Sequence, residues 1–255
     1  VVVDRLVVGP DLAQRLAEGR LIASTDSGTI HCFSATKIQT PATIVQARTD
    51  APFPNDHSIP MFKEAAEQIL KLAGFDQGYC LILDSKTGRL AAEIASRSRM
   101  NIICLESDPK NVAAARKALS EAGLYGTRIV IHQGTLNDVS YQDGFANLIC
   151  SEGALLTGRM PENAAEILRL VKPYGGFVCL GAPSSARGKK LDSSAIAGWL
   201  KKNKFSDWRI ESANGCWAIY RRGVPAGAGE WTHFFADTGN TACSRDTLRN
   251  PRSIQ

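Results

Sequence analysis

Residues 79–106 read YCLILDSKTGRLAAEIASRSRMNIICLE and contain a strand, a turn, a helix and a second strand. The run 79–83 is apolar throughout, which is typical of a strand covered on both faces of a parallel sheet. Residues 90–95 have helical spacing, and residues 101–105 form another apolar run. This order predicts a βαβ unit of an α/β domain.

The same alternation continues along the chain. We expect further strands at 129–132, 145–150 and 176–180, helices at 62–73, 109–122, 161–171 and 195–202, and a hairpin of strands at 208–211 and 216–220. Apolar strands separated by helices predict a doubly wound, mostly parallel sheet. Ligands of such sheets bind beyond the carboxyl ends of the strands, where the strand order reverses.

The two ends of the chain differ from this central part. The predicted segments are a β-meander at 1–36, a linker at 37–60, the α/β domain at 61–222 and a further β-like segment at 223–255. In the first, Val1–Val8 is rich in β-branched residues, and Leu21–Ser24 and Thr29–Phe33 flank a turn at Gly28, which predicts a hairpin. The linker is rich in proline and lacks periodicity.

Composition places the chain among ordinary globular proteins. It has 255 residues, 44% of them apolar, and no apolar run approaches the roughly 20 residues that span a bilayer. The seven cysteines include no C-x-x-C pair, so a zinc site is not expected. This cysteine usage favours a reducing, cytoplasmic compartment, although an exported parent protein stays open. The start on Val1 and the polar end suggest a fragment of a longer protein.

The net charge of +5 is mild, but five lysines gather at positions 189, 190, 201, 202 and 204. A nucleic-acid patch and a solvated helix face both fit such a group. We favour the solvated face, because basic runs alone are weak signals of nucleic-acid binding.

Two features could carry chemistry. The loop 84–89 joins a strand to a helix and has one glycine, Gly88, so a cofactor loop and an ordinary turn fit it equally. Glu106 ends the next strand, about 20 residues after Asp84, where a carboxylate that binds a ribose is placed in nucleotide-binding folds. A solvated acid is the alternative for Glu106, but the two features together favour the ribose role.

Five stretches in order resemble the class I methyltransferases that use S-adenosylmethionine (SAM). They are LILDSKTGRLAAEIA, NIICLESDPKNVAAARKAL, RIVIHQGTL, FANLICSEGAL and LRLVKPYGGFVCLG, within a resemblance that runs from about Gly78 to Tyr220. The resemblance implies a seven-stranded sheet with antiparallel last strands, SAM as cofactor, and transfer of its methyl group to an unknown acceptor. It implies cofactor contacts at Asp84, Ser85, Thr87, Gly88, Glu106, Ser107, Thr135, Leu136 and Ser151.

The chain departs from the usual pattern of this family, acid-x-Gly-x-Gly-x-Gly, in the first loop. Asp84 and Lys86 stand where two glycines are expected, and Ile82 stands where the acid of the pattern is expected. The acid that accepts the adenine amine aligns with Thr135, and Asn147 stands where Asp is common. A domain that has lost catalysis is therefore the alternative to an active enzyme.

No catalytic residue follows from the resemblance. In-line methyl transfer needs orientation above all, and a base only for a protonated acceptor. Glu152 and His57 are candidate bases, although a structural role is favoured for each. A dehydrogenase ranks lower, because Gly-x-Gly-x-x-Gly is missing from the loop.

The ends of the chain carry a second resemblance. RLIASTDSGTIHCF and GAGEWTHFFADTGNTACS resemble pieces of blades in quinoprotein-like (PQQ-type) β-propellers. The resemblance implies that the α/β domain is inserted in, or adjoins, a propeller on which it packs. In that case the domain could be a non-catalytic structural or interaction module. No ligand set for PQQ is visible.

Overall fold

The computed structural model describes residues 12–17, 20–25, 30–36, 49, 51–186, 191–205 and 207–247. These residues form two compact units, with the division between residues 46 and 47. Each unit is described by itself.

The first unit contains a three-stranded antiparallel sheet of β1 (Leu12–Ala17), β2 (Arg20–Thr25) and β3 (Ile30–Ser34), in the order β1-β2-β3. The hairpin expected around Gly28 is present as β2 and β3, which pair from Arg20–Ser34 to Ser24–Ile30. Val1–Val8 lies outside the described residues.

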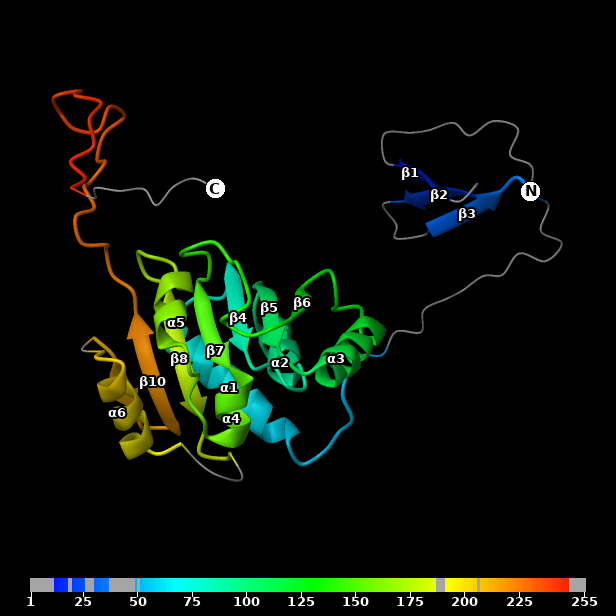
Figure 1. The fold of residues 1–255 in the computed structure, drawn as a ribbon, viewed down its shortest axis with the longest axis horizontal. Coiled ribbons are helices and arrows are strands. Elements are labelled where there is room, and N and C mark those ends of the chain that lie inside the picture. The colour runs from blue at the N-terminus through cyan, green and yellow to red at the C-terminus, as the bar shows by residue number, and fades with distance from the viewer. Residues whose placement is uncertain are drawn as a thin grey trace. The chain divides into compact units, whose positions relative to one another are not determined.

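The second unit is built on a seven-stranded sheet with helices on both faces (Figure 1). Its strands are β4 (Tyr79–Leu83), β5 (Asn101–Glu106), β6 (Ile129–Gln133), β7 (Leu148–Ser151), β8 (Phe177–Ala182), β9 (Arg209–Glu211) and β10 (Cys216–Arg221). Their spatial order is β6-β5-β4-β7-β8-β10-β9. The first five are parallel, and β10 pairs antiparallel with both β8 and β9. The strand order reverses between β4 and β7, which directs attention to the loops there.

The helices are α1 (Ile59–Ala73), α2 (Arg89–Arg97), α3 (Pro109–Glu121), α4 (Glu152–Thr157), α5 (Ala164–Leu170) and α6 (Ser193–Lys202). The first three pack on one face of the sheet, where Ile82, Cys104 and Cys150 point. The last two pack on the other face, on Leu81, Leu83 and neighbours. Alternate residues of the buried strands thus serve opposite layers.

Most of the expected elements are confirmed, with three corrections. The helix expected at 161–171 is α5 at 164–170, with Asn163 as its N-cap. The strand expected at 145–150 is β7 at 148–151, because Ala146 forms only an isolated bridge with Val171. The helix α4 was missed, because it has six residues, one of them Gly153, and shows no helical period. Its N-cap is Ser151, whose Oγ accepts from Ala154 N at 3.0 Å.

The flanking segments are simpler. Part of the expected linker packs on the α/β unit: Phe53 lies against its core, and Thr49 N donates to Glu121 O at 2.9 Å. Residues 223–247 contain turns and the isolated bridge His233–Ala236. Among the described residues, no helix has both the length and the apolar character to cross a membrane.

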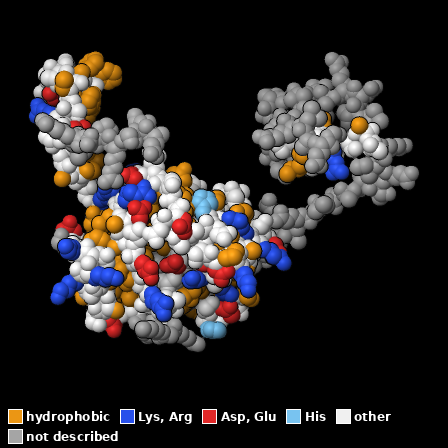
Figure 2. All heavy atoms as spheres, in the orientation of Figure 1, with side chains coloured by type: hydrophobic (Ala, Val, Ile, Leu, Met, Phe, Trp, Pro, Cys, Tyr) orange, Lys and Arg blue, Asp and Glu red, His pale blue; other side chains and the backbone are white. Residues whose placement is uncertain are grey.

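Side chains of both charges are interspersed on the face of the α/β unit seen in Figure 2. Lys201 and Lys202 lie in the last turn of α6, and Lys204 follows it. Residues 189 and 190 lie outside the described part, so that portion of the lysine group is not placed.

Candidate functional site

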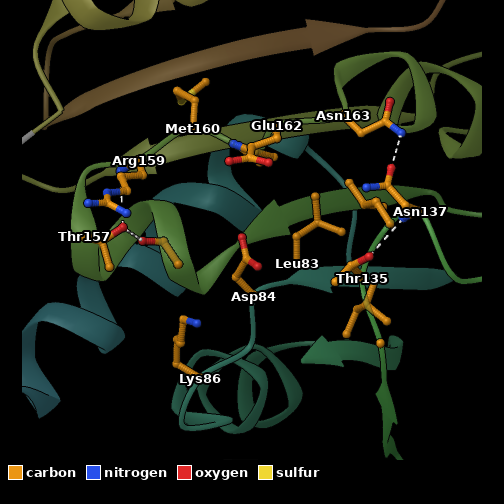
Figure 3. Close-up of a pocket in the computed structure, with 15 residues that line it drawn as sticks. Leu83, Asp84, Lys86, Thr135, Asn137, Thr157, Arg159, Met160, Glu162 and Asn163 are labelled. Carbon is orange, nitrogen blue, oxygen red and sulfur yellow. Dashed lines mark hydrogen bonds between the residues drawn. The ribbon is translucent and has the colours of Figure 1, made fainter. Parts of the chain in front are cut away.

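A cavity of about 340 Å³ opens at the carboxyl ends of the central parallel strands. Asp84 and Lys86 reach into it from the β4–α2 loop, and Glu162 lies on the opposite wall (Figure 3). Thr135 and Leu136, which follow β6, complete one side. The cavity therefore lies at the point where the strand order reverses.

The β4–α2 loop has left-handed backbone at alternate positions. The φ angles are +47° at Asp84, +27° at Lys86 and +76° at Gly88. Only the last of these residues is a glycine, and L-residues in this region cost about 1–2 kcal/mol each. The loop thus keeps a backbone that suits glycine at the two positions where glycine was expected and is missing.

Glu106 lies at the end of β5 and is 2% exposed. Its Oε2 accepts from Lys86 N at 2.8 Å, and its Oε1 accepts from Asp108 N at 2.9 Å and from Asn111 Nδ2 at 3.4 Å. The Lys86 ammonium lies 3.8 Å from Oε1. A carboxylate offers about four acceptor directions, so one direction on Oε2 stays open for another donor.

Glu152, the first residue of α4, binds backbone N–H groups at the end of the β4–α2 loop. It is fully buried, and its carboxylate accepts from Thr87 N at 2.8 Å, Leu90 N at 3.2 Å and the Thr87 hydroxyl. Burial raises the pKa of Glu152 to about 7, while these hydrogen bonds partly oppose the shift. The carboxylate also lies at the N-terminus of α2, where a negative charge is favourable. Its contacts are those of a residue that positions the loop.

Asp84 lies at the mouth of the cavity. Partial burial of its carboxyl raises its pKa; the nearby Lys86 ammonium lowers it, and the charges of Glu106 and Glu162 raise it further. The side chain fits only because residue 153 is glycine: a Cβ there would lie 2.5 Å from the Asp84 Cβ. Gly153 was not among the expected site residues, and no local sequence signal marks it.

The structure separates the nine expected cofactor contacts into three groups. Asp84, Thr135 and Leu136 line the cavity. Five others lie in or behind the loop, namely Ser85, Thr87, Gly88, Glu106 and Ser151. Ser107 is exposed and does not line the cavity.

Other residues noted in the sequence have structural contacts. Asp138 Oδ2 accepts from Thr135 N at 3.1 Å and Thr135 Oγ1 at 2.7 Å, so it closes the turn after β6. Asn147 Oδ1 accepts from Tyr79 N at 3.0 Å and joins two strands. His57 is exposed in the turn before α1.

The far wall of the cavity was missed at the sequence level. It is formed by the segment between α4 and α5, with Arg159, Met160 and Glu162, and by Asn163. Asn163 Nδ2 donates to Asn137 Oδ1 at 2.7 Å and ties this wall to the loop after β6 (Figure 3). Since the two asparagines are far apart in sequence, no local pattern could have paired them.

This strand order, with an antiparallel β10 beside β8 and a cavity at the carboxyl edge, is the class I methyltransferase fold. Residues 84–175 match a family model described as a methyltransferase domain. Comparison with curated proteins found no match.

Many solved structures are similar to the chain, and two of them share a TM-score of 0.51 with it. One is from Methanococcus maripaludis, assigned as an S-adenosyl-L-methionine-dependent methyltransferase, with 25% identity and a TM-score of 0.51 over 64% of this chain and 86% of that one. The other is a SAM-dependent methyltransferase from Aquifex aeolicus, with 15% identity and a TM-score of 0.51 over 65% of this chain and 93% of that one. At 15% identity the second likeness concerns the fold alone.

Proposed function

We propose that the α/β unit binds SAM in the cavity and transfers its methyl group to an acceptor. The observation that carries this proposal is the buried carboxylate of Glu106 at the end of β5, beside a cavity at the switch point of a methyltransferase fold. The family match over residues 84–175 and the 25% identical structure support it.

The residues present fit such a ligand. The open acceptor direction on Glu106 Oε2 suits a ribose hydroxyl. The cavity also presents Asp84 and Glu162 as anions and Arg159 as a cation, which suits a ligand with both an ammonium and a carboxylate. SAM supplies a methyl group activated on a sulfonium, so the chain has to orient it and the acceptor and exclude water.

The acceptor is proposed to enter between Asp84 and the far wall. Asp84 is the carboxyl in this cavity whose pKa is raised, so it takes a proton more readily than an ordinary aspartate. We therefore propose Asp84 ahead of Glu152 and His57 as the base for a protonated acceptor. Glu152 is engaged with the loop, and His57 does not line the cavity.

Calorimetric titration with SAM tests the proposal. The wild-type chain should bind SAM, and Glu106→Gln, which keeps the shape of the side chain but removes its charge, should weaken binding by about tenfold or more. Glu121→Gln, at the exposed end of α3, is the matched control and should bind like the wild type. Folded wild-type protein that gives no heat at millimolar SAM would contradict the proposal.

A second candidate function is a non-catalytic structural or interaction module. What favours it is that Asp84 and Lys86 project into the cavity from positions where glycine was expected, and that Lys86 lies against Glu106. A variant with glycine at both positions distinguishes the two. If it binds SAM and the wild type does not, the cofactor site has been lost in this chain.

The propeller interpretation of the two ends stays a proposal. What supports it is that β1-β2-β3 form an antiparallel meander in a unit of its own, and a propeller blade is a four-stranded antiparallel sheet, so three of its strands would be in place. Calorimetric titration with PQQ tests whether such a propeller would take that cofactor.

A further inference from the structure

Lys86 has two unusual properties that the proposed function leaves unexplained. It is an L-residue with φ +27°. Its backbone and its side chain both contact the carboxylate of Glu106: the backbone N–H donates to Oε2 at 2.8 Å, and the ammonium lies 3.8 Å from Oε1. Its side chain is 36% exposed and lines the cavity, whereas Glu106 is 2% exposed.

The geometry points to Lys86 as a specificity-determining residue whose ammonium competes with the ribose hydroxyls of an adenosyl ligand for Glu106. This inference rests on the proposed function, since it concerns access to the same carboxylate. One ribose hydroxyl can use the open direction on Oε2, but a sugar that also reaches Oε1 must move the ammonium aside.

The charges around Lys86 explain why the ammonium stays there. It lies close enough to Asp84 to lower that residue's pKa, while Glu162 stands across the cavity. Moving the ammonium away leaves the carboxylates of Glu106 and Asp84 with less positive charge beside them. The hydroxyls of a ribose are neutral and do not replace the positive charge of the Lys86 ammonium. Each ligand that carries the sugar therefore binds more weakly, by the electrostatic free energy lost when the ammonium moves away.

A second arrangement would use the same residue differently. The ammonium could pair with the carboxylate of the methionine part of SAM, in which case it would strengthen binding. In the first arrangement the ammonium lowers the affinity for SAM, and in the second it raises that affinity. For 5′-methylthioadenosine, which has the sugar but no carboxylate, the first arrangement again lowers the affinity and the second leaves it unchanged.

Calorimetric titration of both ligands separates these arrangements. Lys86→Met keeps most of the side chain and removes the charge, and Lys110→Met removes an equal charge from the exposed first turn of α3 as the matched control. We expect Lys86→Met to bind SAM and 5′-methylthioadenosine about tenfold more tightly than the wild type, and Lys110→Met to bind both as the wild type does. Adding Glu106→Gln to Lys86→Met should abolish the gain.

The contrary outcomes are distinct. If Lys86→Met weakens SAM but leaves 5′-methylthioadenosine unchanged, the ammonium binds the ligand's carboxylate and the inference is wrong. Equal affinities in wild type and variant also overturn it, with the proposed function intact. If wild type and every variant bind neither ligand, the proposed function fails and the inference with it. Lys86→Gly, which suits the left-handed backbone, provides a second variant if Lys86→Met does not fold.

Discussion

At the scale of single residues, two buried carboxylates hold the β4–α2 loop. Glu106 accepts the N–H of Lys86 and Glu152 accepts the N–H of Thr87, so successive amides are fixed from strand β5 and from the start of helix α4. Charge-assisted hydrogen bonds of this kind are stronger than neutral ones. They offset the strain of Asp84 and Lys86 in the left-handed region, so that the loop retains its conformation without the two glycines.

Glu152 makes the stability of the protein depend on pH. Burial raises its pKa from 4.5 to about 7 in the folded chain, so between these values the folded state binds a proton that the unfolded state does not. Its contribution is therefore complete below pH 4.5 and is lost as the pH rises through 7. The wild type should lose up to about 3 kcal/mol between pH 4.5 and 8, relative to Glu152→Gln. Denaturant unfolding of both proteins across this range measures it, and parallel profiles would rule it out.

Gly153 gives a prediction that depends on one missing methyl group. In Gly153→Ala the new Cβ would lie 2.5 Å from the Asp84 Cβ, so the loop has to shift, and we expect a loss of about 1–3 kcal/mol in stability together with weaker SAM binding. Gly198→Ala in α6 is the control, because its new Cβ meets no atom within 4 Å. It should stabilise the chain by about 0.5–1 kcal/mol. The account of the cavity is wrong if both variants bind SAM equally well.

The sequence predicted the fold better than the site for a physical reason. Glu106 was found because it follows an apolar strand and a loop at a fixed spacing. The contact from Glu152 to Thr87 joins residues 65 positions apart, and the fit of Asp84 against Gly153 depends on the packing of two different elements. Periodicity reports which face of an element is buried, but not which distant side chain meets it.

At the scale of secondary-structure elements, capping residues explain where the helices begin. Asp108 accepts from Lys110 N at 2.9 Å at the start of α3, and Asp192 accepts from Ala195 N at 2.7 Å at the start of α6. The start of α3 at residue 109 agrees with the helix expected from the sequence, where Pro109 begins an apolar periodic run. The short helix α4 was not visible, because one turn shows no period.

The two caps should affect stability alike and ligand binding differently. Asp108→Ala and Asp192→Ala should each lower the free energy of unfolding by about 1 kcal/mol. Only Asp108→Ala should weaken SAM, because the backbone N–H of residue 108 donates to Glu106 and its position depends on the cap. Equal SAM affinities in the two variants would show that the start of α3 does not set the position of Glu106.

At the scale of the whole molecule, the chain combines two units with very different cores. The seven-stranded sheet has buried helices on both faces, whereas the three-stranded sheet exposes Ile22 and Ile30. A small sheet needs a hydrophobic face packed on another layer for independent stability, and among the described residues the face of this sheet that carries Ile22 and Ile30 is exposed. The first unit therefore differs in kind from the α/β unit, as the sequence pattern indicated.

Hydrogen exchange should reveal this difference directly. We expect the slowest amides in β4 and β7, at the centre of the large sheet, and exchange at least about a hundredfold faster in β1, β2 and β3. Mass spectrometry of peptic fragments measures both regions in one sample. Similar protection in the two units would mean that the small sheet is covered in solution.

A crystal structure of the chain soaked with SAM tests the central claim most directly. The account predicts ribose hydroxyls within hydrogen-bond distance of Glu106 Oε2, with the Lys86 ammonium moved away from Oε1. Density for SAM outside this cavity, or an empty cavity with Lys86 still against Glu106 at saturating ligand, would contradict it.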